Sequence, residues 1–380
     1  MATTSPRKLD HIRITVDSRV DHDWTSALLD DVVLVYKALP ETSLNDIDTS
    51  IEFLGKRLSA PIMVTGMTGG HAVAAEINCA IAKAVEELGL MMGVGSQRAA
   101  IENPNLAYTF SIVRKCAPSA VIVANIGAPQ LVKGYGIKEL TKAIEMIDAD
   151  AVAIHLNAAQ EAFQPEGDTD YVGVVDKIRE LADVLGKPII VKETGHGIGL
   201  EAATLLRAVG IKIIDVAGAG GTSWVKVEQY RARAKGDELL AAAASTFSGF
   251  GVPTAQAIVE TRWAAPDACI IASGGIRSGL DVAKAIALGA DVAGLALPVI
   301  NAYVQGGGHA ILNLLKRMIM ELRIAMFLTG SKDLAELRST NIILGQRLLS
   351  LMEARGISAE LYLNGPRLLF KLGSGCSPTP

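Results

Sequence analysis

Eight short apolar runs, rich in valine, isoleucine and alanine, recur along the chain. They cover residues 61–67, 90–96, 120–126, 151–157, 188–194, 213–218, 269–275 and 292–298. Between most of them lie stretches whose apolar positions follow helical spacing, at residues 75–88, 137–146, 171–185 and 280–288. The pattern predicts eight strands that alternate with helices.

The predicted strands are nearly continuously apolar, which is typical of parallel strands that helices cover on both faces. Polar residues and glycines gather at the C-terminal ends of the runs: Thr68, Ser96, Asn125, His155, Asn157, Lys192, Glu193, Gly274 and Gly275. In a closed barrel these ends converge on one mouth, where such enzymes build their active sites. We therefore predict an α/β protein with a (β/α)8 TIM barrel, and an open doubly wound sheet is the alternative.

The predicted barrel occupies residues 61–310 and leaves sequence at both ends. Residues 1–60 are expected to form an N-terminal extension, turn-rich around 41–50, that contributes substrate-binding residues. Beyond residue 310, Ile311, Leu314, Leu315, Met318 and Leu322 follow helical spacing. This spacing predicts helices packed on the barrel over residues 311–372. Residues 373–380 are expected to form a disordered tail.

Composition and charge narrow the classes of function. The net charge of −4 argues against a protein whose main partner is nucleic acid. Two stretches, 239–259 and 292–315, lack charged residues, but serine, glycine and proline interrupt the first and proline and glycine the second, so we predict no membrane span. The N-terminus shows no apolar segment of the kind found in secretory signals. We expect a cytoplasmic protein.

The four cysteines, Cys79, Cys116, Cys269 and Cys376, are widely separated in the sequence and form no CxxC motif. Such spacing is not typical of a zinc site. A cytoplasmic protein also keeps most of its thiols reduced. We therefore expect free thiols rather than disulfides, and no metal ligand among the cysteines.

The strongest local motif is SGGIRSG at residues 273–279, directly after the seventh predicted strand, and GLALP follows at residues 294–298 in the eighth. Adjacent glycines let backbone N–H groups approach a phosphate, and the N-terminus of the next helix favours negative charge. The loops after strands seven and eight are the usual phosphate site of barrel enzymes. A tight turn without a ligand is the alternative.

Two further motifs lie at the ends of the fifth and sixth predicted strands. VKETG at residues 191–195 places Lys192 at the barrel mouth, where a cation suits the electron-rich N1–C2 edge of a flavin. An ion pair between Lys192 and Glu193 or Glu161 is the alternative. AGGTSW at residues 219–224 adds the hydroxyl group of Thr222.

The motif HLNAAQE brings His155, Asn157, Gln160 and Glu161 into one loop after the fourth predicted strand. So many polar groups are difficult to bury without a ligand. Glu161 is a candidate Mg²⁺ ligand, because this ion prefers one or two carboxylates together with substrate phosphate and water. The alternative is a solvated helix N-terminus, at which the helix dipole favours a carboxylate.

RKLDHI at residues 7–12 and GSQR at residues 95–98 supply Arg7, Lys8, His11 and Arg98. These residues suit a diphosphate, which binds charge-assisted donors. For Arg7 and Lys8 the alternative is a solvated basic cluster near a mobile terminus. Residues 224–251 are long for a barrel loop and carry several basic residues, so this segment is a candidate lid.

Together RKLDHI, MTGG (67–70), GSQR, HLNAAQE, VKETG, AGGTSW and SGGIRSG resemble the type 2 isopentenyl-diphosphate isomerase family, in this order and from residue 7 to about residue 298. The resemblance implies an enzyme of isoprenoid biosynthesis that interconverts isopentenyl and dimethylallyl diphosphate by a 1,3-proton shift. It also implies FMN that is active when reduced, NADPH as reductant, Mg²⁺, and a homo-oligomer, a tetramer or octamer.

The resemblance assigns expected roles to single residues. FMN is expected to contact Thr65, Gly66, Met67, Thr68, Ser96, Asn125, Lys192, Thr222, Gly274, Gly275, Arg277, Ala296 and Leu297. The substrate is expected to contact Arg7, Lys8, His11, Ser96, Arg98, His155, Asn157 and Gln160. Mg²⁺ is expected on Glu161, and Gln160 is expected to assist flavin N5, the main acid and base.

The nearest alternative is an FMN-dependent oxidoreductase of the α-hydroxy-acid oxidase or IMP dehydrogenase type, because SGGIRSG is similar to FMN barrels in general. The chain has no paired His and Arg near the seventh strand, as the oxidases have. It also has no cysteine on a predicted mouth loop, as IMP dehydrogenase has. A binding protein on a barrel scaffold is the non-enzyme alternative, and the many polar strand ends argue against it.

Overall fold

The computed structural model describes residues 4–369 and residue 376, without the side chains of residues 4–9. Eight parallel strands close into a barrel, in chain order from β4 to β11, and β11 pairs with β4. The strands are β4 (Ile62–Val64), β5 (Met91–Gly93), β6 (Val121–Gly127), β7 (Ala151–His155), β8 (Ile189–Lys192), β9 (Ile213–Asp215), β10 (Cys269–Ser273) and β11 (Val292–Leu295). The predicted TIM barrel is confirmed, and each strand overlaps one predicted run.

The strands are mostly shorter than the predicted runs, because the last residues of most runs enter the loop that follows, as Glu193 and Thr194 do after β8. Every strand residue except His155 is buried. The register aligns His155 with Lys192, and Lys192 with Asp215, on three neighbouring strands. Polar side chains from separate strands therefore end at the same level of the barrel.

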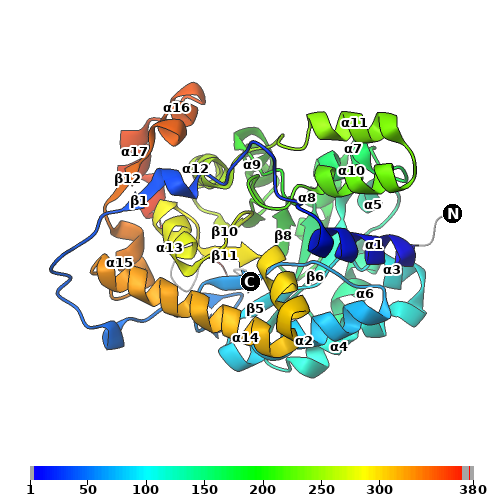
Figure 1. The fold of residues 1–380 in the computed structure, drawn as a ribbon, viewed down its shortest axis with the longest axis horizontal. Coiled ribbons are helices and arrows are strands. Elements are labelled where there is room, and N and C mark those ends of the chain that lie inside the picture. The colour runs from blue at the N-terminus through cyan, green and yellow to red at the C-terminus, as the bar shows by residue number, and fades with distance from the viewer. Residues whose placement is uncertain (1–3, 370–375, 377–380) are drawn as a thin grey trace.

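Helices surround the barrel (Figure 1). Those between the strands are α2 (Ala72–Leu88), α3 (Arg98–Glu102), η3 (Pro104–Leu106), α4 (Tyr108–Cys116), α5 (Ala128–Val132), α6 (Ile137–Ile147), α7 (Ala158–Phe163), α8 (Val174–Val184), α9 (Leu200–Ala208), α10 (Trp224–Ala234), α11 (Glu238–Thr246), α12 (Thr254–Ala264) and α13 (Gly279–Leu288). Helix α13 begins at a capping box, in which Ser278 Oγ accepts from the Asp281 N–H at 3.1 Å and Asp281 accepts from the Ser278 N–H at 2.9 Å.

Both ends of the chain add elements outside the barrel. The N-terminal ones are α1 (Thr4–Asp17), η1 (Leu29–Asp31), β1 (Val32–Leu34), η2 (Leu44–Asp46), β2 (Ile51–Phe53) and β3 (Lys56–Leu58). The C-terminal ones are α14 (Leu297–Leu328), α15 (Leu334–Ser339), β12 (Ile342–Leu344), α16 (Gln346–Ala354), α17 (Ala359–Asn364) and η4 (Pro366–Leu368). Strands β1 and β12 pair antiparallel and join the two ends of the chain.

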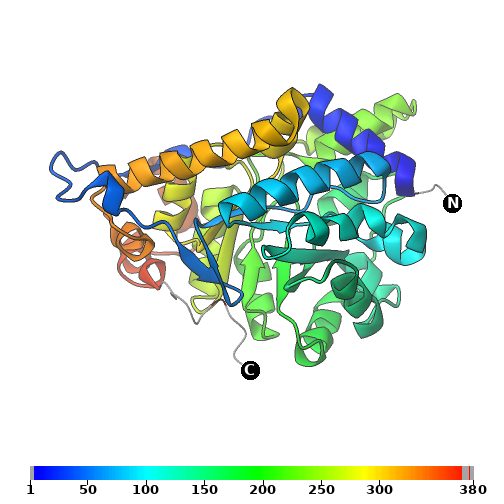
Figure 2. The ribbon, with the colours of Figure 1, turned by 90° about the horizontal axis from the view of Figure 1, so that it is seen from below.

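Helix α14 contains most of the second uncharged stretch, residues 292–315. Pro298 lies in its first turn, and Gly306 and Gly307 leave helical geometry, so the helix is kinked there. Beyond the kink it runs beside α2 along one side of the barrel (Figure 2). Among the described residues, no helix combines the length and apolar content needed to cross a bilayer.

Two sequence-based interpretations of chain segments were wrong. Residues 224–251 are not a long loop, because they contain helices α10 and α11. The C-terminal region is not all helical, because β12 interrupts it and gains a partner strand in β1, which no local pattern reveals. The predicted tail, residues 373–380, lies outside the described residues except for Cys376.

The prediction of free thiols was also wrong. Disulfides join Cys79 to Cys116 and Cys269 to Cys376, with a Cα–Cα distance of 5.5 Å in each pair. Cys79 lies on α2 and Cys116 ends α4, and these two helices pack against each other. Cys79 and Cys116 are far apart in the sequence and meet only because α2 packs against α4, so the sequence alone did not predict this disulfide.

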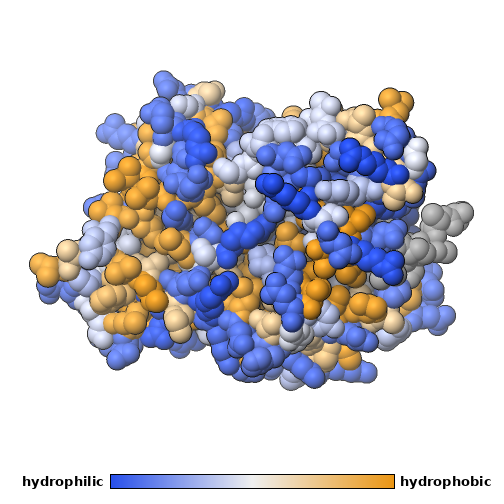
Figure 3. Space-filling model, in the orientation of Figure 1, coloured by the Kyte–Doolittle hydropathy of each residue, from blue (hydrophilic) through white to orange (hydrophobic). Residues whose placement is uncertain are grey.

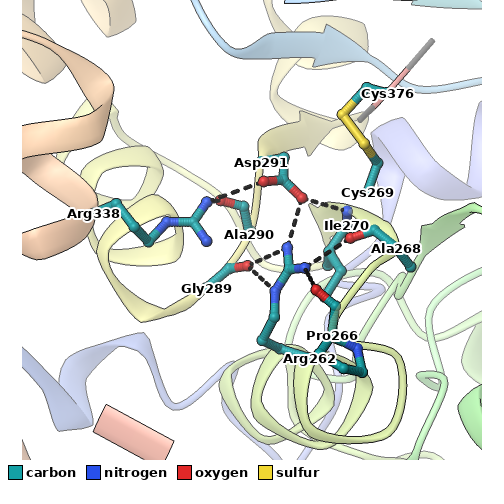
Figure 4. The surroundings of a disulfide bond; sticks show 10 residues. All are labelled: Arg262, Pro266, Ala268, Cys269, Ile270, Gly289, Ala290, Asp291, Arg338 and Cys376. Carbon is teal, nitrogen blue, oxygen red and sulfur yellow. Dashed lines mark hydrogen bonds and ion pairs between the residues drawn. A yellow bond between two sulfur atoms is a disulfide. The ribbon is translucent and has the colours of Figure 1, made fainter. Parts of the chain in front are cut away.

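A buried ion cluster lies beside the Cys269–Cys376 disulfide (Figure 4). Asp291 pairs with Arg262 at 2.6 Å and with Arg338 at 3.2 Å, and it also accepts from the Ile270 N–H at 2.7 Å. Burial lowers the pKa of the Arg338 guanidinium to about 10, although the charge of Asp291 acts in the opposite direction. A single carboxylate thus compensates two buried guanidinium groups.

We predict that Asp291→Asn lowers the free energy of unfolding by about 3–5 kcal/mol, because it removes the carboxylate that pairs with two buried guanidinium groups. The control is Asp176→Asn, which removes an exposed pair with Arg179 and should cost less than about 0.5 kcal/mol. Urea unfolding of both variants measures the difference. Equal unfolding midpoints for the two variants would contradict this account of the cluster.

Candidate active site

A single cavity opens at the carboxyl ends of the barrel strands. It encloses about 1560 Å³ of space, part of which is open to solvent. Its walls come from the ends of the strands, from the loops that follow them, and from residues of α1, among them His11, Ile12 and Thr15. The N-terminal extension therefore closes one side of the barrel mouth.

Every predicted site residue whose side chain the structure describes lines this cavity. They are His11, Thr65, Gly66, Met67, Thr68, Ser96, Arg98, Asn125, His155, Asn157, Gln160, Glu161, Lys192, Thr222, Gly274, Gly275, Arg277, Ala296 and Leu297. Arg7 and Lys8 belong to α1, and their side chains lie outside the described part of the structure. Residues from all seven motifs of the resemblance thus meet at one place.

Lys192 is a buried cation at the end of β8. Its ammonium group donates to the backbone carbonyl of Glu193, and among the described residues it forms no ion pair. The alternative of an ion pair with Glu193 is not realised, because that carboxylate accepts from the N–H groups of Thr194 and Gly195 at 2.6 Å each. Lys192 therefore keeps charge available for an electron-rich ligand.

Gly274 and Gly275 form the turn after β10 with φ angles of +100° and +73°, which side chains rarely adopt. A Cβ atom on Gly274 would collide with the carbonyl oxygen of Gly218, and one on Gly275 would lie 2.7 Å from the Cβ of Ala27. Arg277 follows the turn and pairs with Asp21 at 2.7 Å. Bare backbone and a nearby cation together suit a phosphate group.

The ends of β4, β5 and β6 pack closely at the floor of the cavity. Asn125 donates from Nδ2 to the carbonyl of Val94 at 2.9 Å, and its Oδ1 lies 2.7 Å from His155 Nδ1. A side chain on Gly66 would collide with that same carbonyl. The Thr68 hydroxyl is buried and has no hydrogen-bond partner among the described residues. This orphaned group indicates a missing ligand.

Gln160 lies on α7 in a short polar chain. Its Nε2 donates to Glu228 Oε1 at 3.4 Å, and its Oε1 accepts from Asn157 at 3.3 Å. The same Glu228 oxygen lies 2.9 Å from His11 Nε2. Burial would raise the pKa of Glu228, but the hydrogen bond with His11 and the charge of Arg231 hold it below its usual range. Glu228 is thus a buried anion behind Gln160.

Glu161 and Asn157 are held by further hydrogen bonds. Glu161 accepts from Asn157 Nδ2 at 2.7 Å and from the Asp168 N–H at 2.7 Å. The hydroxyl of Tyr171 donates to Asn157 Oδ1 at 3.0 Å. Arg98 pairs with Asp168 at 3.2 Å and with Glu102 at 2.7 Å. These residues therefore form a connected polar network, in which the carboxylate of Glu161 and the guanidinium group of Arg98 line the cavity.

Sequence reasoning missed Glu228, which touches two predicted site residues, and Trp224, which lines the cavity. Both residues were missed because residues 224–251 were interpreted as a loop. In a helix, Trp224, Glu228 and Arg231 share one face, since they are four and three residues apart. A helical reading of this segment would have placed them together. Gln130 and Gln164 also line the cavity and carried no motif of their own.

Comparison with known proteins first defines the class. The family model described as FMN-dependent dehydrogenase matches residues 2–105 and 116–344. The fold is similar to that of mandelate oxidase, with a TM-score of 0.61 at 18% identity over 88% of this chain and 94% of the other. That likeness concerns the fold alone. The family match defines an FMN barrel.

Two curated relatives define the family more narrowly. The chain is 56% identical over 344 residues to isopentenyl-diphosphate delta-isomerase from Ignicoccus hospitalis, covering 90% of this chain and 94% of the relative. It is 51% identical over 365 residues to the protein of the same name from Aeropyrum pernix, covering 96% of each. The chain therefore belongs to the isopentenyl-diphosphate delta-isomerase family of FMN-dependent proteins.

The cavity fits FMN on its own evidence. A buried cation without an ion pair among the described residues, an orphaned hydroxyl and a turn of two glycines all line the same cavity. The cavity lies at the carboxyl ends of the barrel strands, where barrel enzymes bind their ligands. The residues present are thus compatible with the cofactor of the family.

His22 lies behind the loop after β9, and its protonation is unfavourable. Burial lowers its pKa to about 4 from 6.5, while the hydrogen bond with Gly221 acts in the opposite direction and the nearby His196 lowers it further. The two imidazole rings lie 5.2 Å apart, edge to face. The folded protein therefore holds His22 in the neutral form.

This pKa predicts how stability depends on pH. As the pH falls, the unfolded chain binds a proton at His22 before the folded protein does, so the contribution is complete above pH 6.5 and is lost between pH 6.5 and 4. The loss should be about 1.4 kcal/mol per pH unit, about 3 kcal/mol in all. His22→Asn cannot titrate, and its urea unfolding midpoints should fall less over this range. Parallel pH profiles for both proteins would contradict the prediction.

Proposed function

We propose that this protein interconverts isopentenyl diphosphate and dimethylallyl diphosphate by a 1,3-proton shift, with reduced FMN, in isoprenoid biosynthesis. One observation carries the proposal: relatives named isopentenyl-diphosphate delta-isomerase are 47–56% identical over at least 90% of the chain. The cavity supports it, because it joins features suited to a flavin with a carboxylate and a guanidinium group suited to a metal-bound diphosphate.

The reaction adds a proton to one carbon of an unactivated alkene and removes a different proton, so no net redox change results. Bound reduced FMN supplies a position, N5, that gives and takes a proton, and an electron-rich face beside the developing tertiary cation. The protein must exclude water from this reaction and hold the substrate still. The enclosed strand ends and the cover by α1 support that role.

Lys192 and the turn after β10 are the proposed cofactor contacts. The ammonium group of Lys192 would bind the N1–C2 edge of the flavin, where reduction places negative charge. The backbone N–H groups of Gly274 and Gly275 and the side chain of Arg277 would bind the phosphate. Thr65, Gly66, Met67, Thr68, Ser96, Asn125, Thr222, Ala296 and Leu297 would complete the cofactor site.

Gln160 is the proposed catalytic side chain. Its amide is neutral at all ordinary pH values, so it orients a proton rather than supplying one. Contacts with Glu228 and Asn157 fix both ends of the amide. The amide therefore presents a defined donor and acceptor to the reacting carbon chain or to a water molecule beside it.

Glu161 is the proposed Mg²⁺ ligand, and the substrate diphosphate would complete the coordination together with water. His11, Arg98, His155 and Asn157 would bind the diphosphate oxygens, and Ser96, Arg7 and Lys8 stay part of the proposed substrate site. Because the diphosphate is bound away from the reacting carbons, its binding energy helps to position the alkene.

A homo-oligomer is part of the proposal. Apolar residues gather on one face over β1, α13 and α15 (Figure 3). Val33 on β1, Leu280 on α13 and Ile343 on β12 are exposed apolar side chains. A large exposed apolar surface favours association. NADPH as reductant rests on the resemblance of the motifs, and a cytoplasmic location stays a prediction.

We predict that the purified protein with FMN isomerises isopentenyl diphosphate only when the flavin is reduced, and only with Mg²⁺. Air oxidation or chelation of the metal should each lower the rate at least about 10²-fold, because each removes charge stabilisation from the transition state. Proton NMR of the two diphosphates measures the conversion. Equal rates with oxidised FMN would contradict the proposal, and oxidation of a hydroxy acid instead would favour the oxidoreductase alternative.

We predict that Gln160→Leu lowers kcat by about 10²-fold while the KM of the diphosphate changes less than about threefold, because proton positioning matters in the transition state. Gln164→Leu is the control. This amide lies one turn further along α7, lines the same cavity and bonds Glu161 rather than Glu228. At saturating Mg²⁺ its kcat should fall less than about tenfold. Equal losses in both variants would remove the special role of Gln160.

A further inference from the structure

The segment of residues 20–28, which we name the N-terminal strap, lies against the loops that line the cavity. In Figure 1 it is the dark blue chain that leaves α1 and runs toward β1. The Ser223 N–H donates to the carbonyl of Val20 at 2.8 Å, and the Ala255 N–H donates to that of Ala27 at 2.9 Å. Residues 21 and 222 form an isolated antiparallel bridge.

His22 connects the strap to the loop after β9. Its backbone N–H donates to the carbonyl of Gly221 at 3.0 Å, and its Nδ1 lies 3.0 Å from that same oxygen and 3.3 Å from the N–H of Gly220. The side chain is buried, and its Nε2 has no hydrogen-bond partner among the described residues. Among the described residues, the hydrogen bonds of the His22 ring therefore all involve Nδ1 and the loop after β9.

Glycines allow the strap, the loop and the phosphate turn to lie in direct contact. A Cβ atom on Gly220 would collide with the backbone of Ala27 in the strap. One on Gly221 would collide with the backbone nitrogen of Gly275. A displacement of the strap is therefore transmitted through the loop to the N–H group of Gly275.

We propose that the N-terminal strap positions the phosphate end of the FMN site, and that His22 is its positioning residue. The strap fixes the loop after β9 against Gly275, so that the N–H groups of the turn keep one orientation before the cofactor binds. Preorganised donors bind an anion more tightly than donors that must reorder. The N-terminal extension would thus serve the cofactor as well as the substrate.

This inference rests on the proposed placement of the FMN phosphate at Gly274 and Gly275. Riboflavin separates the two claims, because it carries the same ring system without the phosphate. The experiment titrates the flavin-free protein with FMN and with riboflavin, and follows the quenching of flavin fluorescence. The wild-type protein should bind FMN at least about tenfold more tightly than riboflavin, as expected for charge-assisted hydrogen bonds.

Three variants of His22 test the positioning role. Asparagine places its amide near the position of Nδ1, glutamine places it near that of Nε2, and leucine only fills space. His22→Asn should keep the preference for FMN within about twofold of wild type. His22→Gln and His22→Leu should reduce this preference by about tenfold, by weakening FMN binding while riboflavin binding stays within about twofold.

A pair of glycine variants gives a second test that does not depend on the histidine variants folding. Gly220→Ala should weaken FMN binding by about tenfold, whereas Gly210→Ala should leave it unchanged, because Gly210 also has a positive φ angle but open space around it. A wild-type protein that binds both flavins equally would overturn the phosphate placement and the strap together. A wild-type preference for FMN that persists in His22→Leu and Gly220→Ala would overturn the strap alone.

Discussion

Closure of the parallel barrel is the constraint on which the site depends. Both faces of the sheet are covered, so a polar side chain within a strand would be buried without water, at a cost that hydrogen bonds must offset. Almost all strand residues are therefore apolar and buried, and polar groups are confined to the strand ends. Because the strands are parallel, those ends meet in one ring. Asn125, His155 and Lys192, which lie on three different strands, therefore line one cavity.

Buried groups behind the cavity wall then hold the side chains that face the cavity. Glu228 contacts Gln160 and His11, Tyr171 bonds Asn157, and the carboxylate of Glu193 accepts from backbone N–H groups instead of pairing with Lys192. Each of these groups has its hydrogen bonds satisfied, so it adds rigidity without adding unpaired polarity. Lys192 and Thr68 differ, because the Lys192 ammonium group forms no ion pair and the Thr68 hydroxyl has no hydrogen-bond partner among the described residues.

The sequence predicts the barrel and most of the cavity because the relevant signals are local. A strand end is visible as the residue where an apolar run stops, and a barrel brings all such ends together, so Lys192 and Gly275 could be placed in one site without coordinates. Contacts between distant elements were beyond this reasoning. The disulfides, the pairing of β12 with β1 and the contact of Glu228 with His11 each depend on how helices and extensions pack. The spacing of apolar residues within one segment does not indicate such packing.

The central claim is that the ring of strand ends surrounds a flavin, with Lys192 at one edge and Gln160 facing the substrate. A crystal structure of the protein with reduced FMN, Mg²⁺ and isopentenyl diphosphate tests it most directly. We expect the N1–C2 edge at the ammonium group of Lys192, the cofactor phosphate at Gly274 and Gly275, and the substrate between the ring and Gln160. A flavin bound outside this cavity, or a substrate remote from Gln160, would contradict the account.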